Sequence, residues 1–90
     1  MPASCETVVT LPREVDLHAR PAADFVRTAL GFAAQIAVAS DGREADAKSL
    51  LAVLALGAKG GSELRLTADG DDAGPAVDAL AGCVTGLHES

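Results

Sequence analysis

The chain has 90 residues, of which 49% are hydrophobic, and its 13 acidic and 7 basic side chains give a net charge of -6. That length predicts one domain spanning residues 1–90, and the apolar content excludes intrinsic disorder. The charge excludes nucleic acid and anionic membranes as partners, because both require clustered Lys and Arg. With no apolar run long enough for a membrane span and no secretion signal, we expect a monomeric cytoplasmic protein.

The first half of the chain is predicted to form a strand, a helix and a hairpin. The expected strand runs from Cys5 to Leu11, and an apolar stripe predicts a helix from about Ala19 to Leu30. Gly31 is a natural end for that helix. A strand from Gln35 to Ser40 follows, and Asp41-Gly42 then predicts a hairpin. The returning strand from Arg43 to Asp46 is short and polar enough to form a sheet edge.

The second half is predicted to form a short helix, a strand and a final helix. The short helix is expected from Ser49 to about Leu54, and the strand from Glu63 to Ala68 with Leu64 and Leu66 facing inward. Pro75 is expected to open the last helix. The order β-α-β-β-α-β-α and the hairpin predict an α+β fold, an open-faced β-sandwich in which helices cover one face of a four-stranded antiparallel sheet.

His18 is the most informative candidate residue, because it precedes a helix whose first turn contains Arg20 and Pro21. A proline there costs no hydrogen bond, so His18 is predicted to be the N-cap. The free N–H groups of Ala19 and Arg20, the helix dipole and the guanidinium would then attract a phosphoryl group carried on a neutral imidazole. The alternative is a surface histidine beside a solvated arginine.

Ser49 and the leucines after it form a second candidate site. Serine is a common N-cap, and a phosphate added there would face the start of the short helix. Capping alone is the alternative interpretation. A helix of this length cannot bury all of its apolar side chains, so some of Leu50, Leu51 and Leu54 are expected to form an exposed docking patch.

Other residue patterns give weaker indications of chemistry. Cys5 and Cys83 lack the spacing of metal ligands and are interpreted as buried or partly buried thiols, and no metal or other cofactor is expected. His88, near the C-terminus, is interpreted as a solvated histidine. The acidic run at residues 69–72 lacks a calcium-loop pattern, and the glycines at residues 57–61 precede a strand rather than a helix. Both are interpreted as ordinary turns.

From about residue 5 to residue 87, the chain resembles HPr, the histidine-containing phosphocarrier family of the bacterial phosphoenolpyruvate-dependent sugar phosphotransferase system. Three motifs carry the resemblance: LHARPA at residues 17–22, AKSLLAVLALG at residues 47–57 and KGGSEL at residues 59–64. Their shared order and separation are more specific than the histidine motif alone. The resemblance implies the same β-α-β-β-α-β-α sandwich.

The resemblance also implies a role for each candidate residue. By this resemblance, His18 is the residue phosphorylated on Nδ1 by phospho-Enzyme I, and Arg20 moves to meet the phosphoryl group. Ser49 corresponds to the serine that a regulatory kinase phosphorylates. Arg27 corresponds to a partner-contact position, and the patch that docks Enzyme I and the Enzyme IIA domains comprises Leu50, Leu51 and Leu54. Such a protein is a carrier within a phosphotransferase chain, not an enzyme by itself.

Asp16 departs from the family pattern, which usually has glycine two residues before the histidine. We hypothesise that its carboxylate holds Arg20 in the resting protein. Two other functions stay open: a regulatory interaction protein of the same fold, controlled by phosphorylation at His18 or Ser49, and a plain ligand-binding or assembly domain. Phosphorylation by Enzyme I would exclude the ligand-binding or assembly domain. Onward transfer to an Enzyme IIA domain would then distinguish the phosphocarrier from the regulatory protein.

Overall fold

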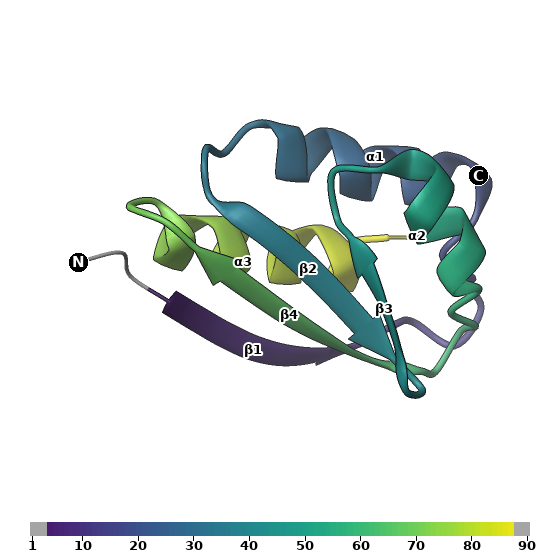
Figure 1. The fold of residues 1–90 in the computed structure, drawn as a ribbon. Coiled ribbons are helices and arrows are strands. Elements are labelled where there is room, and N and C mark those ends of the chain that lie inside the picture. Colours follow the sequence, from purple (N-terminus) through teal and green to yellow (C-terminus); the bar gives the residue numbers. More distant parts are fainter. Residues whose placement is uncertain (1–3, 88–90) are drawn as a thin grey trace.

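A computed structural model describes residues 4–87 of the chain, and it has four strands and three helices in the predicted order (Figure 1). His88 therefore lies outside the described residues. The elements are β1 (Ser4–Thr10), α1 (Ala19–Leu30), β2 (Gln35–Ser40), β3 (Arg43–Asp46), α2 (Leu50–Leu56), β4 (Glu63–Asp69) and α3 (Ala73–Thr85).

The strands form one antiparallel sheet in the order β1-β4-β2-β3, so β1 and β3 are its edges. Helix α3 packs on β1 and β4, α2 packs on β3, and α1 contacts both other helices. Figure 1 shows α1 and α3 along the sheet and α2 at one end of it. The predicted open-faced sandwich is confirmed. None of the helices in residues 4–87 is long and apolar enough to cross a membrane.

Several predicted boundaries differ from the structure by one or two residues. Strand β1 begins and ends one residue earlier than predicted, and β4 continues to Asp69. Helix α2 begins at Leu50, with Ser49 as its N-cap, and continues to Leu56, where Gly57 adopts a left-handed φ of 66°. Helix α3 begins at Ala73 rather than at Pro75. The hairpin prediction is confirmed, since Asp41 and Gly42 both have positive φ, as a tight turn of this type requires.

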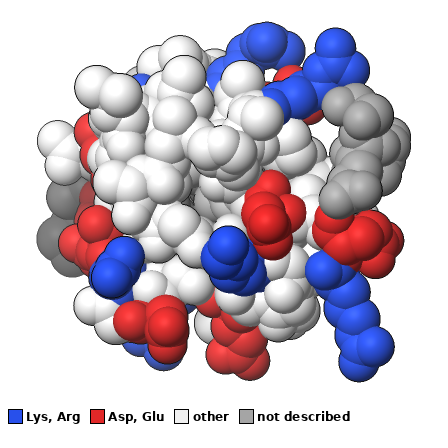
Figure 2. Space-filling view, turned by 90° about the vertical axis from the view of Figure 1, so that its right-hand side faces the viewer, with Lys and Arg blue, Asp and Glu red and all other residues white. Residues whose placement is uncertain are grey.

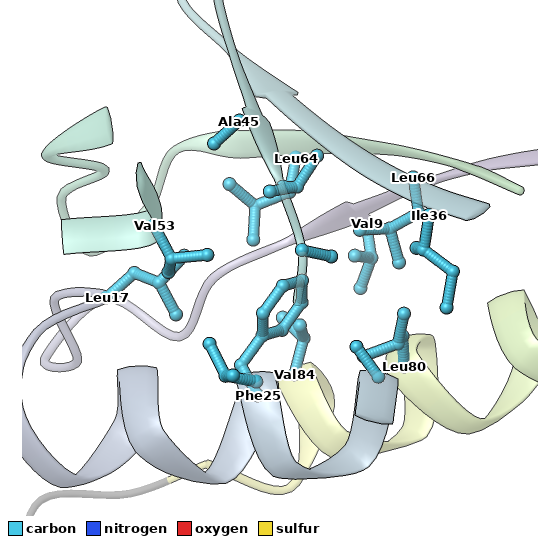
Figure 3. Close-up of a cluster of buried hydrophobic side chains, with 14 of the residues drawn as sticks. Val9, Leu17, Phe25, Ile36, Ala45, Val53, Leu64, Leu66, Leu80 and Val84 are labelled. Carbon is cyan, nitrogen blue, oxygen red and sulfur yellow. The ribbon is translucent and has the colours of Figure 1, made fainter. Parts of the chain in front are cut away.

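The core lies between the sheet and the helices and consists of aliphatic side chains around one aromatic ring (Figure 3). Phe25 of α1 is fully buried, and Leu64 and Leu66 of β4 point inward as predicted. Cys5 and Cys83 are free, partly buried thiols. Leu17, which precedes α1, and Val53 of α2 are both buried in this core, so both segments are anchored in it.

Asp72 ties the start of α3 to the turn between α1 and β2. Its carboxylate accepts the N–H groups of Ala33 and Ala34, each at 2.8 Å. The bond from Ala33 is the main reason that the pKa of Asp72 lies below its ordinary value of 3.8. Because the folded protein then binds this proton more weakly than the unfolded chain, the resulting stabilisation is complete above pH 3.8 and is lost as the pH falls through the folded-state pKa.

Candidate functional site

His18 is the N-cap of α1 and is exposed, as predicted from the sequence. Its backbone is extended, with φ of -149° and ψ of 161°, and its carbonyl accepts the N–H of Ala22 at 3.4 Å. In the part of the chain that the structure describes, the side chain makes no capping hydrogen bond. The imidazole is therefore open to solvent and to an approaching partner.

Within residues 4–87, two backbone N–H groups at the start of α1 are free to bind an anion. Among the described residues, neither Ala19 nor Arg20 has an acceptor for its N–H, and Pro21 has no N–H to donate. Ala19 also adopts a left-handed φ of 51°, which an alanine rarely does. Unpaired donors at the positive end of a helix dipole attract phosphate.

Arg20 is exposed in the first turn of α1. In the described part of the chain it has no ion pair or side-chain hydrogen bond. Its guanidinium can therefore turn towards a group on His18 without first breaking another contact. Its forked donors match the geometry of phosphoryl oxygens.

The segment that carries His18, residues 11–18 (the site loop), is bonded along its length to residues 57–62 (the support loop). Leu11 donates to Ser62 O at 2.9 Å and accepts the Gly61 N–H at 3.0 Å. Further along, the Leu17 N–H donates to Ala58 O at 2.9 Å. The buried Leu17 side chain also anchors the site loop in the core (Figure 3). The backbone of His18 is thus fixed although its ring is exposed.

The hypothesis that Asp16 holds Arg20 is wrong. The Asp16 carboxylate accepts the Gly60 N–H at 2.8 Å, and no ion pair joins Asp16 to Arg20 among the residues that the structure describes. A depression of about 250 Å³ opens beside the ring, and its lining includes His18, Leu54 and Lys59. Sequence reasoning assigned Lys59 to a plain loop, because only the pairing of the two loops brings it to His18.

Helix α2 presents an apolar surface at the same end of the molecule. Leu50 and Leu51 are 42% and 81% exposed, and Leu54 is half-buried. We call these three residues the leucine patch. Val53 and Leu56 are buried, so the two faces of the helix are distinct. Figure 2 shows this end of the molecule, where a broad area without charged side chains is bordered by Lys, Arg, Asp and Glu.

Ser49 directly precedes the leucine patch, whereas Arg27 lies on α1. The half-buried Ser49 accepts the N–H of Ala52 at 3.2 Å through its hydroxyl, which confirms the predicted cap. Arg27 is exposed in the last turn of α1 and pairs with Asp24 at 3.3 Å. Within residues 4–87, no group of three or more His, Cys, Asp or Glu side chains is arranged to hold a metal ion.

Comparisons with known proteins agree with this geometry. Residues 5–85 match the family model described as the PTS HPr component phosphorylation site. Phosphocarrier protein HPr of Vibrio cholerae is 41% identical over 92% of this chain and 98% of its own. That of Streptomyces coelicolor is 47% identical over 81% of each chain. The crystal structure of HPr from Bacillus anthracis aligns with a TM-score of 0.86 at 38% identity, covering 91% of this chain and 98% of the other.

Proposed function

The chain belongs to the HPr family of phosphocarrier proteins, and from that premise we propose that His18 accepts a phosphoryl group from phospho-Enzyme I. The group then passes to sugar-specific Enzyme IIA domains during phosphoenolpyruvate-dependent sugar uptake in the cytoplasm. The observation that carries this proposal is the exposed His18 ring at the start of α1, beside two N–H groups without acceptors in the described chain.

The chemistry is an in-line transfer to the imidazole. The lone pair on Nδ1 of His18 attacks phosphorus, the P–N bond forms, and the bond from phosphorus to the donor breaks. The other ring nitrogen keeps its proton. The Ala19 and Arg20 N–H groups and the Arg20 guanidinium then stabilise the phosphoryl oxygens.

Transfer of the phosphoryl group to the next protein requires that its stabilisation on His18 be moderate. A carrier that bound its phosphoryl group as strongly as a buried cage would raise the barrier to the next transfer. Here the donors are two backbone amides at an exposed helix start and one exposed arginine. Such a site stabilises the dianion and leaves the phosphorus open to attack by the next acceptor.

Partner recognition is assigned to the leucine patch, with Arg27 as a polar contact. The patch and His18 lie near each other, since Leu54 lines the same depression as His18. One protein can therefore cover the leucines and reach the imidazole. Apolar side chains exposed together on a short helix favour a docking role over a purely structural one.

The position of Ser49 supports a second, regulatory function at the same surface. A serine kinase would add a dianion next to the exposed Leu50, and the phosphoester would also disturb the bond from Ala52 to the hydroxyl. An anion at the edge of an apolar interface must be desolvated when a partner binds. Phosphorylation at Ser49 would therefore lower partner affinity.

The test is to incubate the protein with Enzyme I and phosphoenolpyruvate and to measure label that is labile in acid and stable in base. The chain has two histidines, so His88→Ala is a matched control for His18→Ala. We expect His18→Ala to fold normally and take no label, and His88→Ala to be labelled like wild type. Label that is kept in His18→Ala and lost in His88→Ala refutes the assignment.

A further inference from the structure

Asp16 bonds to two parts of the site at once. Its Oδ1 accepts the N–H of Gly60 at 2.8 Å, across 44 positions of the chain. Its backbone carbonyl accepts the N–H of His18, also at 2.8 Å. This second bond closes a tight three-residue turn around Leu17, directly before the helix. Asp16 therefore links the support loop to the residue that carries the imidazole.

Gly60 presents its N–H to Asp16 because the two loops approach each other very closely. A Cβ at position 60 would lie 2.1 Å from the carbonyl oxygen of Arg13, so only glycine fits against the site loop. Along the two paired loops, the Gly60–Asp16 bond lies between two sets of backbone hydrogen bonds. Leu11 bonds to residues 61–62 at one end, and Leu17 bonds to Ala58 at the other. It is the one side-chain contact in this series of backbone hydrogen bonds.

We propose that Asp16 is a positioning residue for phosphoryl transfer: through Gly60 it fixes the turn before α1, so that the His18 ring is held beside the free N–H groups. This inference rests on the proposed function. Transfer is fastest when the acceptor atom is already in place, because no entropy is then lost in ordering it. The carboxylate is occupied by the Gly60 N–H, and Lys59 adds a positive charge to the lining that Asp16 and His18 share.

The test compares two substitutions at this position. Asp16→Asn keeps an oxygen that can accept the Gly60 N–H but removes the charge, whereas Asp16→Ala removes the acceptor. Glu14→Ala is a matched control, because Glu14 is an exposed acid of the same loop and has no side-chain hydrogen bond or ion pair among the described residues. Each variant is assayed for steady-state transfer from phospho-Enzyme I, with the carrier as the varied substrate.

We expect Asp16→Ala to lower kcat by about tenfold, the loss of one well-placed hydrogen bond to a charged acceptor, while KM changes little because the leucine patch is intact. Asp16→Asn should lose less than Asp16→Ala, about threefold, because a neutral acceptor keeps part of the hydrogen bond. Glu14→Ala should stay within about twofold of wild type, because Glu14 makes no such bond among the described residues. The amide resonance of Gly60 in NMR spectra should move strongly in Asp16→Ala. Thermal unfolding confirms that each variant is folded.

Equal kcat for wild type and a folded Asp16→Ala overturns the positioning role, as does an equal loss in the Asn and Ala variants, which would indicate an effect of charge. An unchanged Gly60 amide resonance in Asp16→Ala refutes the contact itself. Absence of label on wild type is a different result, since it rejects the proposed function, and the Gly60 resonance still reports on the contact.

Discussion

Replacing Leu51 by alanine is expected to weaken binding to Enzyme I and leave the free protein as stable as before. Leu51 is 81% exposed, so its truncation removes little packing, and surface substitutions of this kind change stability by about 0.5 kcal/mol or less. Burying a leucine side chain contributes about 1.5–3 kcal/mol, so covering the exposed 81% of Leu51 contributes about 1.2–2.4 kcal/mol. Because about 1.4 kcal/mol is tenfold in affinity, Kd should rise roughly 7- to 50-fold.

The assay is a calorimetric titration of Enzyme I with wild type and with Leu51→Ala, together with thermal unfolding of each free protein. Val8→Ala is the control, because Val8 is also an exposed apolar residue, 51% exposed, but lies on the face of the sheet opposite the buried Val9. Its Kd should equal that of wild type. Equal Kd values for wild type and Leu51→Ala would refute the docking role of the leucine patch, and equal losses in both variants would show that the effect is not local.

Three further predictions follow from the same geometry. Arg20→Ala should slow transfer to His18 by about tenfold, the worth of one charge-assisted contact, without changing the thermal midpoint, and a normal rate would contradict the role of the guanidinium. Ser49→Asp should keep the helix cap, since aspartate is also a good N-cap, but raise the Kd for Enzyme I several-fold; a titration giving equal Kd values would contradict this. Asp72→Ala should lower the thermal midpoint at neutral pH, and the difference from wild type should shrink below pH 3.8; a difference independent of pH would exclude the carboxylate as its source.

The fold could be predicted from the sequence because its local patterns agree with its tertiary structure. The alternation at Leu64 and Leu66, the stripe on the helix that buries Phe25 and the Asp41-Gly42 turn each match the structure. Boundaries were less accurate where a cap decides them: the helix after Ser49 continues to Leu56 and ends only where Gly57 turns left-handed.

The immediate surroundings of His18 were predicted only in part. Its exposure and its place before α1 follow from local sequence, since Pro21 marks the start of the helix. The bond from Gly60 to Asp16 joins residues 44 positions apart and depends on how two loops pair, which no periodicity indicates. For the same reason the opposite charge of Arg20 suggested a pair with Asp16 that does not form among the described residues.

The most direct test of the central claim is to phosphorylate the wild-type protein with Enzyme I and phosphoenolpyruvate and to locate the phosphorus by NMR. The predicted result is one phosphohistidine on Nδ1 of His18, with the Ala19 and Arg20 amide resonances shifted as their free N–H groups bind the phosphoryl oxygens. A phosphoryl group on any other residue, or on His18 with both amide resonances unmoved, would contradict it.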